Sequence, residues 1–163
     1  MPGLERFRTA QDAPGSGFEE ALQEIRAGAK TGHWIWYVFP QLSGLGASAM
    51  SEAYAIADAA EAEAYLRNPT LRARLLTITA AVAEQSTTRD RPLRAVMGSE
   101  TDARKLVSSL TLFEHVALML QRTDGLDDYA ALAEAAGAVL AAAAAAGYAR
   151  CPSTLARLAV PRS

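Results

Sequence analysis

The sequence predicts a single compact all-α domain of six or more helices across residues 1–163. Three observations predict this fold. Signals for helix starts recur along the chain, apolar residues follow at helical spacing, and an alanine-rich tract lies near the end. Only residues 33–39 contain a run that would also suit a strand, and we expect at most a minor strand there. With 50% hydrophobic and 21% charged residues, the chain has enough apolar surface for one core.

Two short helices are predicted at the start of the chain. The first has residues at helical spacing and ends at a Pro14-Gly15 turn; these residues are Leu4, Phe7 and Gln11. The second is predicted to begin at a capping box formed by Ser16 and Glu19. Its apolar face comprises Phe18, Ala21, Leu22 and Ile25. Gly28 can close this helix in a left-handed conformation.

The middle of the chain contains four further signals for helix starts. The candidate caps are Ser48 or Ser51, Asp58 with Glu61, Asn68 before Pro69, and Ser99 with Asp102. The helix after Asn68 has a continuous apolar face and is predicted to run to about Gln85. The polar segment 86–92 is predicted to be a loop. The helix after Ser99 is predicted to run to about Gln121.

An alanine-rich helix is predicted at about residues 127–149, followed by a short tail at 155–160. Alanine forms helices well but is too weakly hydrophobic to drive membrane insertion, so we predict a soluble helix and no membrane partner. The first residues contain charges and no apolar run, which predicts no signal peptide. We therefore expect a cytoplasmic protein.

Charge and cysteine content exclude several classes of function. The net charge is −2 and the basic residues are scattered, so no nucleic-acid partner is predicted. Cys151 is the only cysteine, which excludes an intramolecular disulfide and multi-cysteine zinc sites. The two histidines lack the spacing of metal ligands, and we expect no metal. No phosphate-loop motif is present, and no cofactor is predicted.

The most distinctive segment runs from His33 to Gly46 and contains both tryptophans of the chain. It can be read as a strand or as a helix, and Pro40 ends either one. Gly44 and Gly46 allow the backbone to approach another group closely. The segment has two interpretations. In the first, its tryptophans fill the core and His33 makes a buried hydrogen bond. In the second, the rings line a pocket where a titratable His33 acts at the surface.

The helix after Ser99 combines an apolar stripe with a polar border. The stripe comprises Leu106, Leu110, Phe113 and Leu120, and we expect it to face the core. The border comprises Lys105, Ser108 and Ser109, which suits a pocket wall. The alternative is structural: both serines bond to carbonyls of the preceding turn and Lys105 is solvated. A serine nucleophile is disfavoured, because Lys105 precedes Ser108 and no Gly-x-Ser-x-Gly motif is present.

These motifs together resemble domain-of-unknown-function family 1810. The matching residues are Leu4-Glu-Arg-Phe7, Phe18-Glu-Glu-Ala-Leu22, His33-Trp-x-Trp-x-x-Phe-Pro-Gln41, Asn68-Pro69 and Lys105-Leu-x-Ser-Ser-x-Thr-Leu-Phe113. The resemblance covers roughly residues 4–120, with apolar departures at Met97 and Leu110. It implies a mainly α-helical, cytosolic bacterial protein without an established activity.

We considered three functions. The first is a small-molecule pocket for a nucleotide or ADP-ribose-like ligand, lined by Lys30, His33, Trp34, Trp36, Gln41, Lys105, Ser108 and Ser109. If the site is catalytic, the reaction is hydrolysis at a glycosidic carbon, with His33 and Lys105 as candidate catalytic residues. The alternative is a protein-binding module that uses exposed aromatic side chains. In the third, the motifs are purely structural.

Overall fold

The computed structural model describes residues 3–160, and this part of the chain is all-α, as predicted. The elements in order are α1 (Glu5–Asp12), α2 (Phe18–Ala27), α3 (Ile35–Val38), α4 (Ala49–Ala53), α5 (Ala59–Arg67), α6 (Pro69–Ala83), the π-helix η1 (Glu84–Thr88), α7 (Leu93–Met97), α8 (Glu100–Asp124), α9 (Asp127–Ala145) and α10 (Pro152–Leu158). Residues 3–160 contain no strand, and a single parallel bridge joins Leu42 to Ile56.

Four helices begin at the caps that the sequence predicts. Ser48, Asp58 and Ser99 each accept a hydrogen bond from the backbone amide three residues later, at 2.9–3.1 Å. Asn68 accepts from the amides of Thr70 and Leu71, both at 3.1 Å, with Pro69 in the first helical position. These caps satisfy amides that would otherwise lack a partner, so they fix where each helix starts.

The predicted capping box at Ser16 is wrong. Helix α2 is preceded by Gly17, and no side chain caps it. A Cβ at Gly17 would overlap the carbonyl oxygens of Gln11 and Ala13, so the chain at this residue packs tightly against the end of α1. The Ser16 carbonyl accepts from the Tyr37 hydroxyl at 2.6 Å instead. The tertiary packing of α1 and α3 therefore sets the start of α2.

The boundaries of three other predicted segments also differ. The π-helix η1 extends α6 to Thr88 and occupies the first part of the predicted 86–92 loop. There the Ser86 hydroxyl donates to the Val82 carbonyl at 2.9 Å, which supports the wider turn. The alanine-rich helix α9 ends at Ala145, before Gly147 with a φ of 97°. Helix α10 begins with Pro152, three residues before the predicted tail, and overlaps that tail up to Leu158.

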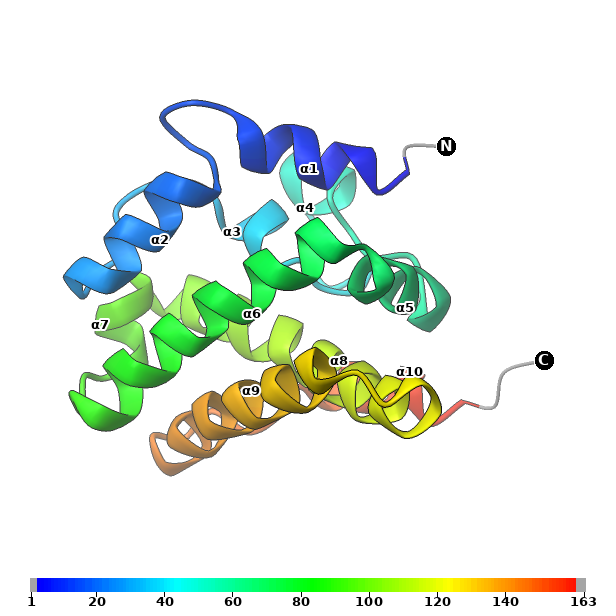
Figure 1. Ribbon diagram of the computed structural model, residues 1–163. Helices are drawn as coiled ribbons and strands as arrows, with labels where there is room; N and C mark the ends of the chain where they lie inside the picture. The colour runs from blue at the N-terminus through cyan, green and yellow to red at the C-terminus, as the bar shows by residue number, and fades with distance from the viewer. Residues whose placement is uncertain (1–2, 161–163) are drawn as a thin grey trace.

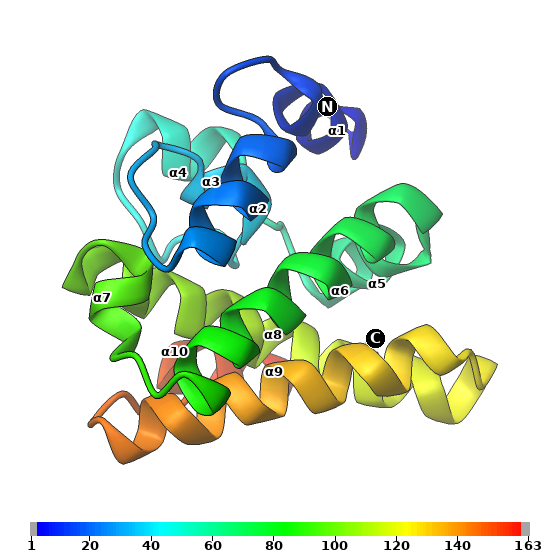
Figure 2. The same ribbon diagram turned by 60° about the vertical axis from the view of Figure 1, so that its left-hand side comes forward.

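The long helices α6, α8 and α9 form the base of the fold. Figures 1 and 2 show α8 and α9 side by side and antiparallel, with α6 across them and α1–α4 on the other side of α6 and α8. The predicted core stripe of α8 is confirmed, because Leu106, Leu110, Phe113 and Leu120 are fully buried. Helix α3 contacts both α1 and α8. The aromatic segment is therefore a helical turn between the N-terminal helices and α8.

By length and composition α9 could cross a membrane, and it is the only such helix among the described residues. In the structure it packs against α6 and α8. Its buried side comprises Tyr129, Leu132, Ala133, Ala136, Val139, Leu140 and Ala143. This side faces neighbouring helices, and 39% of the apolar stretch is buried inside the protein.

Candidate functional site

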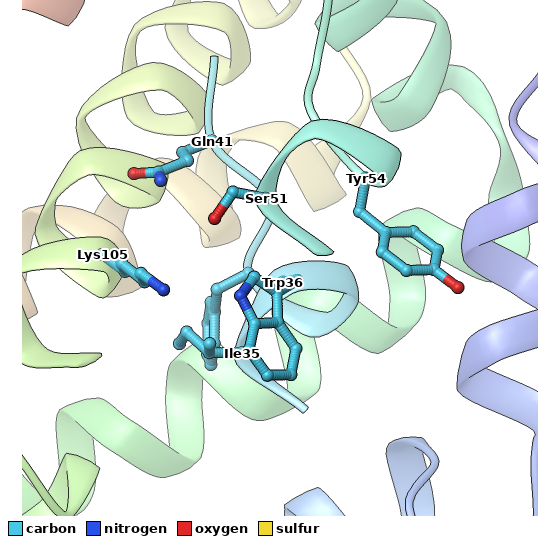
Figure 3. Close-up of a pocket in the computed structure, with 7 residues that line it drawn as sticks. Ile35, Trp36, Gln41, Ser51, Tyr54 and Lys105 are labelled. Carbon is cyan, nitrogen blue, oxygen red and sulfur yellow. The ribbon is translucent and has the colours of Figure 1, made fainter. Parts of the chain in front are cut away.

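A small cavity lies where α3, α4 and α8 meet. Its lining residues are Ile35, Trp36, Phe39, Gln41, Ser51, Tyr54 and Lys105. Three of them, Trp36, Gln41 and Lys105, are among the predicted site residues. Figure 3 shows polar groups from separate elements around one space, with the Lys105 ammonium and the Ser51 hydroxyl directed toward it. No carboxylate and no histidine is among these lining residues.

Lys105 and Trp36 form the centre of this site. The Lys105 Nζ lies 5.4 Å from the centre of the Trp36 ring, a cation–π contact. The chain has only two lysines, and among the described residues Lys105 has no carboxylate within ion-pair distance. The Trp36 Nε1 is buried and has no hydrogen-bond partner within residues 3–160. A buried donor without a partner is costly, so these two donors together favour an acceptor between them.

Ser51 and Gln41 add further polar groups to the same space. The Ser48 hydroxyl donates to the Ser51 Oγ at 2.9 Å, so Ser51 keeps its own proton to donate. The Gln41 carbonyl accepts from the Ile56 amide at 2.9 Å, which fixes the backbone that carries the Gln41 amide group. Gly46 allows this close arrangement, because a Cβ there would lie 2.5 Å from the Ser51 Oγ and 2.7 Å from its Cβ.

The space enclosed by these residues is small, about 10 Å³. This volume accommodates one water-sized group, whereas sites that enclose a whole ligand have several hundred Å³. A phosphate or carboxylate oxygen fits, but a nucleoside does not. The ring of Trp36 is only partly buried, so the rest of a larger ligand would lie at the rim. The site is therefore suited to a small anionic group held by neutral and cationic donors.

The family assignment follows from a comparison with models of known families. A model described as a protein of unknown function (DUF1810) matches residues 2–136. The chain belongs to the DUF1810 family. This match confirms the resemblance seen in the sequence and extends beyond the predicted 4–120 into α9.

A solved structure closely resembles this DUF1810 protein. It is the conserved hypothetical protein Rv1873 from Mycobacterium tuberculosis, with 35% sequence identity and a TM-score of 0.71. The similarity covers 97% of each chain, so it includes α10, which lies outside the family match. A comparison with curated proteins gave no match.

Lys30 and Trp34, both predicted to bind ligand, belong to a different network. The Lys30 Nζ lies 2.7 Å from Asp102 Oδ2 and 5.0 Å from the centre of the Trp34 ring. Trp34 is fully buried, and its Nε1 donates to Glu24 at 3.0 Å. These contacts tie the 29–34 segment of the DUF1810 chain to α2 and α8. Neither side chain lines the α3–α8 cavity.

Glu24 organises the backbone of the same segment. Its carboxylate accepts from the amides of Thr31 and Gly32, both at 2.8 Å, and from the Trp34 indole. Burial raises the pKa of the Glu24 carboxyl, but the bonds from Gly32, Thr31 and Trp34 outweigh it, so the pKa lies below its ordinary value. This role has no local sequence signal, because a solvent-exposed glutamate on a helix face has the same sequence pattern.

The other predicted site residues also lie outside the cavity lining. His33 is exposed, and its carbonyl accepts from the Tyr37 hydroxyl at 3.3 Å. Ser108 and Ser109 are buried within α8, and their hydroxyls have no hydrogen-bond partner among the described residues. Within residues 3–160 no cluster of histidine, cysteine, aspartate or glutamate could hold a metal.

Four residues of the cavity were not predicted from the sequence: Ile35, Phe39, Ser51 and Tyr54. Ile35 and Phe39 belong to the distinctive 33–46 segment, but the sequence does not single them out as pocket residues. Ser51 is predicted only as a possible helix cap, and Tyr54 follows it by three residues. The spacing of Gly46, Ser48 and Ser51 could have indicated a tight helix start beside the aromatic segment. The contact with Lys105 depends on how α4 packs and has no local sequence signal.

Proposed function

We propose that this DUF1810 protein binds a small molecule through an anionic group, a phosphate or a carboxylate, at the α3–α8 cavity. The observation that carries the proposal is the pair formed by Lys105 and Trp36. Within residues 3–160, an ammonium without an acidic partner lies beside a buried indole N–H without an acceptor. An oxygen of an anion placed between them would satisfy both donors at once.

The lining chemistry supports an anion over a cation or a neutral ligand. Ser51 and Gln41 can donate hydrogen bonds, and no acidic side chain lines the cavity. An anionic oxygen would therefore meet donors on several sides and no repulsive charge. A cation would meet Lys105 without any compensating carboxylate.

Nucleotides and ADP-ribose-like compounds are the ligand class to test first. The small volume favours entry of one phosphate oxygen, with the rest of the phosphate and the nucleoside at the rim beside the exposed part of Trp36. Lys105 already lies over one face of the Trp36 ring, so a base would stack on that face only if Lys105 moved. We therefore expect the phosphate to contribute most of the affinity. A cytoplasmic location, where such compounds are present, is part of the same proposal.

The proposal is limited to binding. Hydrolysis requires a general acid or base within reach of the substrate, and histidine and the carboxylates are absent from the cavity lining. The protein-binding alternative has less support, because none of the large apolar side chains exposed among the described residues is aromatic. They are Met50, Leu118, Leu126, Leu155 and Val160.

Calorimetric titration tests this function. Inorganic phosphate, AMP, ADP-ribose and uncharged adenosine would each be titrated into wild type, Lys105→Met and Arg122→Met. Arg122 is exposed on the same helix and is the control for nonspecific attraction of anions. We expect wild type and Arg122→Met to bind AMP, Lys105→Met to lose at least ten-fold in affinity, and adenosine to bind weakly. Equal affinities of wild type and Lys105→Met for every anion would contradict the proposal.

A further inference from the structure

A second cavity, of about 150 Å³, lies on another side of α8. Its lining residues are Arg104, Val107, Tyr148, Ala149, Cys151 and Pro152. Cys151 is the only cysteine of the chain, and its side chain is partly exposed. The sulfur is therefore accessible to a small reagent in the folded protein. This cavity shares no lining residue with the α3–α8 cavity.

Two buried hydroxyl groups lie beside the Cys151 sulfur. They belong to Ser108 of α8 and Thr154 of α10, which are 5% and 0% exposed. Neither hydroxyl has a hydrogen-bond partner within residues 3–160. A buried hydroxyl without an acceptor is unfavourable, and a negatively charged sulfur would be an acceptor for both. The two hydroxyls therefore favour the thiolate form of Cys151.

These two hydroxyls and two backbone amides together set the direction in which the pKa of Cys151 moves. Burial raises the pKa of the Cys151 thiol, but the Thr154 hydroxyl and amide, the Ser108 hydroxyl and the Ser153 amide outweigh it, and the pKa lies below its ordinary value. The Cys151 amide donates to the Thr111 hydroxyl at 3.1 Å, which fixes the backbone of Cys151 against α8. Reactive cysteines are found in such partly exposed, thiolate-stabilising surroundings.

The charged groups around this cavity are two arginines, each paired with a glutamate. Arg104 lines the cavity, with its guanidinium 5.4 Å from the centre of the Tyr148 ring. Its ion pair with Glu100 is long, 3.7 Å, and solvent-exposed, so it is weak. Arg150, the residue before Cys151, is bonded to Glu114 at 3.0 Å. Arg104 is thus the cation at this cavity that could contact an acidic reagent.

We propose that Cys151 is a nucleophilic thiol that undergoes exchange with small disulfides carrying carboxylate groups. The Cys151 proton passes to solvent, and the thiolate attacks one sulfur of the disulfide. A bond forms between that sulfur and Cys151, the original sulfur–sulfur bond breaks, and the other half leaves as a thiolate with the bonding electron pair. Arg104 contacts a carboxylate of the reagent. Because the chain has no second cysteine, the mixed disulfide persists until an external thiol removes it.

The test measures the reaction rate of the folded full chain with two disulfides, the dicarboxylate dithiobis-nitrobenzoate and the neutral dithiodipyridine. Rates would be followed against pH for wild type, Ser108→Ala, Arg104→Gln and the control Arg122→Gln. We expect the wild-type rate to be half-maximal below about pH 8.5, the pKa of an ordinary cysteine. Ser108→Ala should raise this pH. Arg104→Gln should slow the reaction with the dicarboxylate several-fold and leave the rate with the neutral disulfide unchanged. Arg122→Gln should change neither rate.

Three results would overturn the proposal. The first is a wild-type rate that reaches half its maximum at or above about pH 8.5. This result needs no variant. The second is a rate independent of reagent concentration, because labelling would then follow unfolding. The third is an equal effect of Arg104→Gln on both reagents, which would remove the preference for acidic disulfides. The intact mass of wild type and of Cys151→Ser, each measured after reaction with the disulfide, identifies the modified residue. A circular dichroism melt of each variant shows whether it is folded.

Discussion

The Lys30 ammonium lies 2.7 Å from the Asp102 carboxylate, in the first turn of α8. The Lys30 side chain is 6% exposed and that of Asp102 is 19% exposed, so this ion pair is largely shielded from water. The other lysine, Lys105, lies one turn further along α8 and has no acidic partner among the described residues. The two lysines of this DUF1810 protein therefore have different roles, one in stability and one at the α3–α8 cavity.

Lys30→Met should destabilise the protein by about 3 kcal/mol, because removing one partner of a buried pair leaves the other charge uncompensated. Lys105→Met should cost less than about 1 kcal/mol, the value of a partly exposed cation–π contact. Urea unfolding of both variants beside wild type measures the difference. Similar losses in the two variants would mean that Lys105 is as much a structural residue as Lys30.

Phe113→Ala should cost about 3–5 kcal/mol, because a large buried side chain would leave a cavity. Phe113 is fully buried, and its ring centre lies 5.1 Å from that of Tyr65. Leu118→Ala on the same helix is the matched control, since Leu118 is 42% exposed and should cost little. Denaturant melts of both variants would test this, and a loss below about 1 kcal/mol for Phe113→Ala would place Phe113 outside the core.

Glu24→Gln should destabilise the protein most at neutral pH. The folded pKa of Glu24 is below its ordinary value of about 4.5, so the carboxylate contributes its full stabilisation above that pH. As the pH falls through the folded pKa, the carboxyl is protonated and the stabilisation is lost. The difference between wild type and Glu24→Gln should therefore shrink below about pH 4.5. Urea unfolding at several pH values measures it, with the exposed Glu134→Gln as a control whose effect should stay small at every pH.

Gly46→Ala should disturb the α3–α8 cavity, whereas Gly44→Ala should not. A Cβ at Gly46 would lie 2.7 Å from the Ser51 Cβ, so the wall of the cavity must shift. A Cβ at Gly44 would meet nothing within 4 Å, but its φ of 87° would strain the backbone by about 1–2 kcal/mol. Nuclear magnetic resonance of the Trp36 indole N–H should show a changed chemical shift in Gly46→Ala only. An unchanged Trp36 signal in Gly46→Ala would show that Gly46 does not support the cavity.

The sequence predicted the helix starts that depend on neighbouring residues. A cap such as Asp58 joins a side chain to an amide three residues later, so its signal is contained in a few residues. The start of α2 was predicted wrongly because Gly17 is placed by carbonyl groups of the preceding helix end. The π-helix η1 was missed because its polar sequence is equally typical of a loop.

The sequence identified the part of the candidate site that has a local pattern. It singled out Trp36, Gln41 and Lys105, which line one cavity, as polar or aromatic residues at the margin of apolar stripes. It also grouped Lys30 with them, although the carboxylate of Asp102 far along the chain accounts for Lys30. Periodicity gives the face of a helix on which a residue lies, but it does not identify the partner that packs there.

The proposed function places an anion between Lys105 and the Trp36 indole. A titration with AMP, followed by the proton–nitrogen spectrum of the two tryptophan indole groups, tests this placement. Trp34 Nε1 is already bonded to Glu24, whereas Trp36 Nε1 has no partner among residues 3–160. We expect the Trp36 signal to move and to saturate with AMP while the Trp34 signal stays in place, and we expect no movement in Lys105→Met. A Trp36 signal that does not move in wild type, or that moves equally in Lys105→Met, would contradict the claim.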